Sequence, residues 1–145
     1  MEYGKRWFVV ILLIFSALLA ACGSKSTYTK IEPAVVEAID GTELNRVTLT
    51  QKAFERLDIQ TDEVRDTQVD GASRKVIPYS ALLYDVHGGT WAYVNPEPLT
   101  FMRAEITVDH IDGDDVFLTA GPDSGTAVVT VGAAELFGTD TGVGK

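Results

Sequence analysis

Cysteine and histidine are scarce in this chain. Its 145 residues include one cysteine, Cys22, and two histidines, His87 and His110. A disulfide framework needs paired cysteines, and a zinc site needs three or four nitrogen, sulfur or oxygen ligands within tetrahedral reach. The composition therefore excludes a disulfide scaffold. We also expect no metal at the two histidines, because they fall in different predicted hairpins.

Positive charge is also limited. The chain has 12 Lys and Arg against 21 Asp and Glu, which gives a formal net charge of −9. Proteins that bind nucleic acids neutralise phosphates with clustered Lys and Arg side chains. We therefore expect no nucleic-acid partner.

Motifs that would carry catalysis are missing. The serines lack the strand-turn-helix elbow of a nucleophile, and the glycine-rich residues 121–125 precede a predicted strand, whereas a phosphate loop precedes a helix. The acidic residues 109–115 do not match the alternating spacing of a calcium loop, so a polar hairpin turn is the simpler interpretation. The sequence predicts no catalytic residue, no metal ligand and no cofactor, and hence a protein that is not an enzyme.

One uncharged apolar run is present, at residues 7–21, directly after Lys5 and Arg6. It is shorter than the roughly 20 residues that a membrane-spanning helix needs, and its basic start and small-residue end are typical of a secretory signal peptide. The run ends in Leu19, Ala20, Ala21 and Cys22, which look like the lipobox of bacterial lipoproteins. That resemblance implies cleavage before Cys22 and lipidation of its thiol.

A lipobox predicts a specific organisation of the chain. Residues 1–21 would be a cleaved lipoprotein signal peptide, and residues 22–42 a lipidated N-terminus and flexible tether rich in Ser, Thr and Lys. Acyl chains on Cys22 would anchor the protein to the extracytoplasmic face of a bacterial membrane, as a cell-membrane or periplasmic lipoprotein. An uncleaved anchor helix, or a chance cysteine at an ordinary secretory signal, is the alternative.

The remaining chain shows mainly the period-two alternation of half-buried strands. About seven short strands are predicted, together with one short helix at residues 51–57 that Thr50 would cap. Residues 66–74 are predicted to be a loop, residues 99–111 one long strand, and residues 138–145 a flexible tail. The predicted class is all-β, a small barrel or a sandwich, with its domain at residues 43–137.

Aromatic side chains are the remaining candidates for binding. Trp91 and Tyr93 share one face of a predicted strand, and Phe101 lies near the start of the long strand predicted at residues 99–111. These three residues are possible partner contacts. The alternative is that they pack in the core, because a small β domain needs large apolar side chains.

Several segments, taken in order, resemble the periplasmic adaptor subunits, or membrane fusion proteins, of resistance-nodulation-division (RND) efflux transporters. Residues 47–64 (VTLTQKAFERLDIQTDEV) resemble the opening strand-helix-strand of those subunits. The segments that resemble their C-terminal membrane-proximal region are VIPYSALLYD (76–85), GTWAYV (89–94), FMRAEITV (101–108), DDVFL (114–118), GPDSGTAVVTVG (121–132) and AEL (134–136).

The resemblance implies a fold and a role. In full adaptors a lipoyl-like sandwich, a helical hairpin and a barrel separate the two regions, whose ends meet in space as the membrane-proximal domain. Here residues 66–74 join the two regions directly, so the chain resembles that one domain behind its own lipid anchor. We therefore expect a non-catalytic accessory that associates with an efflux permease in the membrane.

Two alternatives remain open from the sequence. The domain could be a lipid-anchored module that binds a small ligand or an envelope polymer unrelated to transport. It could also be an enzyme subunit without an active site of its own.

Overall fold

The computed structural model describes residues 32–142. The expected signal peptide, its Leu19, Ala20 and Ala21, and the lipidation site Cys22 lie outside the described residues. None of the described helices is both long and apolar enough to cross a membrane.

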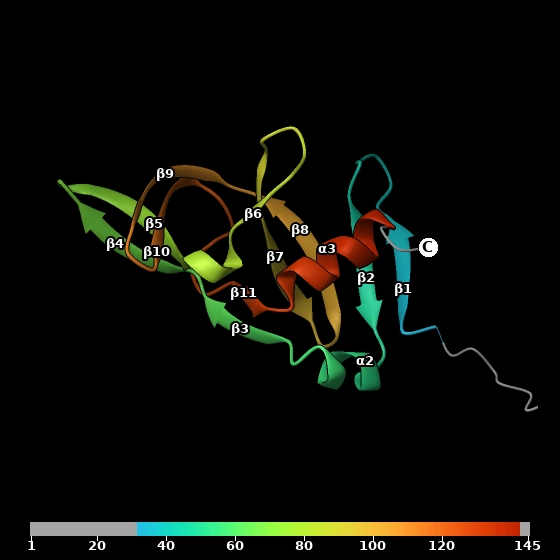
Figure 1. The fold of residues 1–145 in the computed structure, drawn as a ribbon. Coiled ribbons are helices and arrows are strands. Elements are labelled where there is room, and N and C mark those ends of the chain that lie inside the picture. The colour runs from blue at the N-terminus through green and yellow to red at the C-terminus, as the bar shows by residue number, and fades with distance from the viewer. Residues whose placement is uncertain (1–31, 143–145) are drawn as a thin grey trace, which may run out of the picture. The chain divides into compact units, whose positions relative to one another are not determined.

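Residues 32–142 form eleven strands in two antiparallel sheets, accompanied by short helices (Figure 1). The first sheet runs in the order β1 (Ala34–Ala38), β2 (Asn45–Leu49), β8 (Thr100–Glu105), β7 (Thr90–Glu97), β11 (Ala127–Val131) and β3 (Gln60–Glu63), and β6 (Leu83–Tyr84) pairs with β7. The second sheet runs in the order β4 (Arg65–Val69), β5 (Ala72–Pro78), β10 (Asp115–Ala120) and β9 (Thr107–Asp112). Within the described residues, the first and last strands of each sheet do not pair with each other, so both sheets are open. The predicted all-β class is confirmed, and of the two predicted architectures the sandwich-like one is formed.

Three short helices accompany the sheets: α2 (Gln51–Arg56), the 3-10 helix η2 (Tyr79–Ala81) and α3 (Ala133–Thr141). The predicted helix α2 begins as expected, because Oγ1 of Thr50 accepts a hydrogen bond from the Ala53 backbone N–H at 3.2 Å. Helix α3 lies across the first sheet and contacts β2 and β7 (Figure 1).

The first sheet is covered on both faces, which produces two apolar clusters. One cluster lies between the first sheet and the helices: Val47, Leu49, Ala53, Ile59, Tyr93, Phe101, Val129, Ala133 and Leu136. The other lies between the two sheets: Val64, Ile77, Ala81, Leu82, Ala92, Ile106, Val116, Leu118 and Val128. Alternation within single strands produces this division, since Ala92 and Tyr93 are neighbours in β7 and point to opposite faces.

The prediction of one strand over residues 99–111 is wrong, because the chain changes sheets at Ile106. Strand β8 belongs to the first sheet and β9 to the second. The Ile106 backbone N–H donates to the Thr90 carbonyl at 3.0 Å, and the Thr90 hydroxyl donates to the Ile106 carbonyl at 2.6 Å. These bonds satisfy the backbone at the corner, and apolar alternation continues through it, so the sequence pattern did not reveal the break.

The prediction of a loop over residues 66–74 is also wrong, because β4 and β5 form a hairpin there. Its turn consists of Asp70 and Gly71, which have φ values of 50° and 80°. Two successive positive φ angles suit a tight hairpin turn, for which Asp-Gly is a favoured pair. Strand β4 is mostly exposed, so its polar composition lacks the apolar alternation by which strands are predicted.

The predicted domain boundaries were too narrow at both ends. Strand β1 lies within the expected tether at residues 22–42, and α3 extends to Thr141 within the expected tail at residues 138–145. Ala34 and Val36 pack against the core cluster, and Asp140 is buried. Pairing with β2 orders β1, and contacts with β2 and β7 order α3. Neither element has a strong local signal.

Candidate functional site

The turn between β6 and β7 is held by Asp85. Its Oδ1 accepts hydrogen bonds from the backbone N–H groups of His87 and Gly89, both at 2.8 Å, and its Oδ2 accepts one from Nε1 of Trp91 at 2.9 Å. The predicted turn at residues 87–89 is thus formed around a carboxylate. The bond from the Trp91 indole, followed by that from Gly89, holds the pKa of Asp85 below its ordinary value.

Gly89 is required by close packing in this turn. A Cβ at this position would lie 2.6 Å from Oδ2 of Asp85 and 3.0 Å from Nε1 of Trp91. A side chain would therefore disturb the hydrogen bond between the carboxylate and the indole. The turn therefore positions Trp91 of β7 beside β8.

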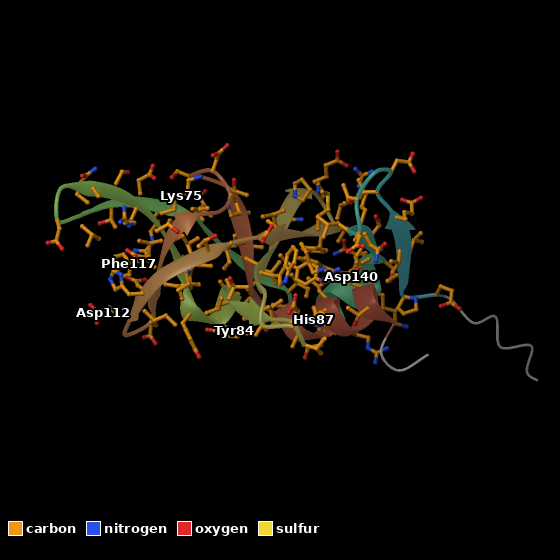
Figure 2. All side chains as sticks on the ribbon, turned by 90° about the horizontal axis from the view of Figure 1, so that it is seen from above. Lys75, Tyr84, His87, Asp112, Phe117 and Asp140 are labelled. Carbon is orange, nitrogen blue, oxygen red and sulfur yellow. The ribbon has the colours of Figure 1, made fainter. Side chains whose placement is uncertain are left out.

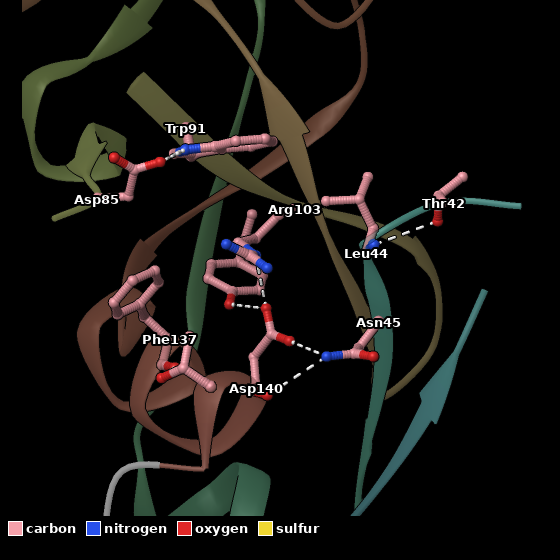
Figure 3. A network of polar contacts seen from close by, with 10 residues as sticks. Thr42, Leu44, Asn45, Asp85, Trp91, Arg103, Phe137 and Asp140 are labelled. Atoms are coloured by element: carbon pink, nitrogen blue, oxygen red, sulfur yellow. Dashed lines mark hydrogen bonds and ion pairs between the residues drawn. The ribbon is translucent and has the colours of Figure 1, made fainter. Parts of the chain in front are cut away.

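Arg103, on β8, lies between two aromatic rings. Its guanidinium carbon is 5.2 Å from the centroid of the Trp91 ring and 5.7 Å from that of Phe137 on α3 (Figure 3). Contacts of this kind attract a cation to the ring faces. Arg103 is 13% exposed in its side chain, so it fills the space between the turn and the helix.

Asp140, on α3, balances the charge of Arg103. Its Oδ2 lies 2.7 Å from Nε of Arg103, although the N–H is not aligned for a hydrogen bond, so the contact is an ion pair. The same oxygen accepts a hydrogen bond from the Tyr93 hydroxyl at 2.6 Å, and Oδ1 accepts one from Nδ2 of Asn45 at 2.8 Å (Figure 3). Burial, followed by the bond to Asp140, raises the pKa of Tyr93 well above its ordinary value, so its hydroxyl stays protonated and donates.

A pocket of about 370 Å³ opens beside this network. Its walls come from the β1–β2 loop, the β6–β7 turn, strands β7 and β8, and helix α3. The lining residues are Glu43, Leu44, Asp85, Val86, His87, Trp91, Arg103, Phe137 and Thr141.

The pocket combines apolar walls with acidic groups. Leu44, Val86 and Phe137 offer apolar surface, while Glu43 and Asp85 add carboxylates. Both oxygens of Asp85 already accept hydrogen bonds. The pocket is therefore suited to holding an apolar group. Val86, in the β6–β7 turn at its rim, is 90% exposed to solvent.

The three predicted contact residues have different environments. Tyr93 and Phe101 are fully buried, so the prediction that they contact a partner is wrong and the core alternative applies to them. Trp91 is partly exposed at the pocket. Tyr93 and Phe101 belong to the cluster under the helices, and Trp91 does not.

Asn45, Arg103 and Asp140 were not predicted from the sequence. Arg103 occupies an alternating position that a charged residue usually takes toward solvent, and Asp140 lies in a Gly- and Thr-rich segment. The turn at Asp85 could be predicted from the sequence, because the glycine pair Gly88 and Gly89 follows it. No local signal pairs Arg103 with Asp140.

The histidines are not brought together. His87 lies in the β6–β7 turn, whereas His110 stacks on Phe117 of the second sheet with ring centroids 4.4 Å apart. Figure 2 shows His87 and Phe117 in separate parts of the fold. Within residues 32–142, no group of three or more His, Cys, Asp or Glu side chains is arranged to hold a metal ion.

Comparisons with known proteins identify no relative of this chain. No family model, no curated protein and no solved structure matches it.

Proposed function

We propose that the chain is a non-catalytic, lipid-anchored accessory protein that docks on an RND-type efflux transporter at the extracytoplasmic face of a bacterial membrane. One observation carries this proposal: the two segments that resemble adaptor ends are interleaved in one sheet. Strand β2 from residues 47–64 pairs with β8, and β3 from the same segment pairs with β11. This pairing supports the proposal because the resemblance implies that the two ends of an adaptor fold together.

The proposed role of the anchor is positioning. Acyl chains on Cys22 would confine the domain to the membrane surface, which raises its effective concentration near an integral-membrane partner. Loss of incorporated radioactive fatty acid in Cys22→Ser tests this part separately. Continued labelling of Cys22→Ser would contradict it.

The proposed docking surface is the β6–β7 turn with the adjoining pocket. Val86 lies at the turn with 90% of its surface exposed, and the three hydrogen bonds to Asp85 hold the turn in place. A rigid turn that exposes an apolar side chain loses little conformational entropy when it binds a partner.

Co-purification tests the proposed partner. The tagged full-length chain is isolated in mild detergent from the bacterium that makes it, and we expect a multi-span RND permease to be retained with it. Val86→Asp should reduce the retained permease by about tenfold, because a charge would enter the contact. Ile111→Asp is the matched control, since Ile111 is 42% exposed on the second sheet and should leave retention unchanged. Isolation of the wild-type chain without a transporter would refute the proposal.

The second candidate function is a lipid-anchored module that binds a small ligand, and the pocket favours it. A volume of about 370 Å³ is within the size range of small-molecule sites. Because a ligand of the folded state stabilises it, amphipathic organic compounds should raise the melting temperature of the chain with no transporter present. Loss of that rise in Phe137→Ala would assign the binding to the pocket.

A further inference from the structure

Strand β1 is an edge whose outward backbone groups can be identified. Among the described strands, β2 alone pairs with it. The Ile39 N–H donates to the Leu44 carbonyl, and the Thr50 N–H donates to the Pro33 carbonyl. In an antiparallel pair the bonded positions alternate, so Val35 and Glu37 bond to β2. The N–H and C=O groups of Ala34, Val36 and Ala38 therefore point away from the sheet. Figure 1 shows β1 at the edge of the first sheet.

This edge carries fewer charges than the edges at β3, β4 and β9. Strand β3 ends in Asp62 and Glu63, β4 begins with Arg65 and Asp66, and β9 has two aspartates. The one charge of β1, Glu37, lies opposite Arg46 of β2. Natural edge strands are commonly protected by charges or proline against pairing with another chain.

The edge also has exposed apolar surface. Val35 is 55% exposed, while Ala34 and Val36 lie on the opposite face of the strand and pack against the core cluster. A strand added beside β1 would satisfy the outward backbone groups and cover part of Val35. The five residues Ala34–Ala38 are thus an unprotected template for pairing.

We propose that β1 pairs antiparallel with β1 of a second copy of this chain, about a two-fold axis at Val36. Val36 then faces Val36 of the partner subunit, and Ala34 faces Ala38 of the partner subunit. Both are bonded positions, so the outward N–H and C=O groups of all three residues find partners in about six hydrogen bonds. The first sheet continues across the two-fold axis into the second copy.

Charge selects this register over its neighbours. A two-residue shift one way places Glu37 opposite Glu37 of the partner subunit, and like charges directly opposite destabilise a sheet. A two-residue shift in the opposite direction places Ala38 opposite residue 32 of the second copy, which lies outside β1. The proposed register uses all five residues and places Val35 opposite Glu37 of the partner subunit. A second copy therefore fits the edge without a like-charge contact, and this inference stands independently of the proposed function.

Disulfide cross-linking tests the register in the full-length chain in mild detergent. Cys22→Ser removes the only native thiol, and Val35→Cys and Glu37→Cys are then made separately. Val35 and Glu37 of the partner subunit would be a non-bonded pair with Cα atoms about 4.5 Å apart, within the range that a disulfide spans. Mixing the two variants should produce at least about tenfold more cross-linked dimer than either variant alone. Equal cross-linking by Val35→Cys alone would overturn the register.

A proline at the edge tests the backbone bonds. Ala38→Pro removes one outward N–H per chain without affecting the β1–β2 ladder, because the bonds to β2 come from the odd-numbered positions. We expect it to weaken the dimer by about 10- to 50-fold in sedimentation equilibrium, the combined effect of two backbone bonds. Ala38→Ser keeps the N–H and is the matched control, and circular dichroism verifies folding. A wild-type monomer, or a dimer that Ala38→Pro leaves unchanged, would refute the proposal.

Discussion

Asp140 is a buried charge that joins segments far apart in the sequence. Its carboxylate is fully buried on α3, where it contacts Arg103 of β8, Tyr93 of β7 and Asn45 of β2. Burying a carboxylate is costly unless an opposite charge and hydrogen-bond donors surround it. These partners meet that requirement, and they hold the C-terminal part of α3 on the first sheet beside the pocket.

Replacing Asp140 by alanine should therefore destabilise the fold strongly. Asp140→Ala leaves Arg103 largely buried without its counter-ion and the Tyr93 hydroxyl without an acceptor. We expect the free energy of unfolding in urea to fall by about 3 kcal/mol. Asp123→Ala is the control, because Asp123 is fully exposed in its ion pair with Lys75 and its loss should change stability by less than about 0.5 kcal/mol. Similar losses from both substitutions would contradict the buried-charge interpretation.

At the scale of elements, α3 shows how glycines in one helix have opposite roles. Gly132 caps the N-terminus of α3 with a φ of 85°, and a Cβ there would collide with Cδ1 of Ile59. Gly138 lies within the helix, where a Cβ would meet no atom within 4 Å apart from the neighbouring backbone of the helix itself. The first position requires glycine, whereas the second loses helix stability by having it.

Alanine at these two positions should have effects of opposite sign. Gly132→Ala should lower the free energy of unfolding by about 1–3 kcal/mol, because alanine must adopt a left-handed conformation and displace Ile59. Gly138→Ala should raise it by about 0.5–1 kcal/mol, since alanine restricts the unfolded chain. Chemical denaturation of both variants measures the difference. A destabilised Gly138→Ala would show that the helix packs there more tightly than in this structure.

At the scale of the whole described unit, the first sheet has an apolar cluster on each face. Val128 of β11 is fully buried in the cluster between the sheets, and the neighbouring Val129 is buried in the cluster under the helices. The two clusters thus share the backbone of one strand. Because the clusters are joined in this way, we expect the sheets to unfold together.

Truncation of Val128 tests this coupling. Val128→Ala should lower the free energy of unfolding by about 2 kcal/mol through lost apolar burial and a cavity. Amide hydrogen exchange of the slowest protons should accelerate equally in β8 of the first sheet and β10 of the second, since both would exchange through global unfolding. Protection that is retained in β10 and lost in β8 would mean that the sheets unfold separately.

The sequence by itself determined the features that depend on neighbouring residues. It predicted the all-β class, the Thr50 cap of α2 and the turn at residues 87–89, because capping, alternation and glycine turns are local properties. Only the tertiary structure decided that the chain changes sheets at Ile106, that Tyr93 is buried while Trp91 reaches the pocket, and that Arg103 pairs with Asp140. These outcomes depend on contacts between residues that are distant in the chain. These contacts stabilise the fold only when the sheets and α3 pack together, so they cannot be predicted from a short stretch of sequence.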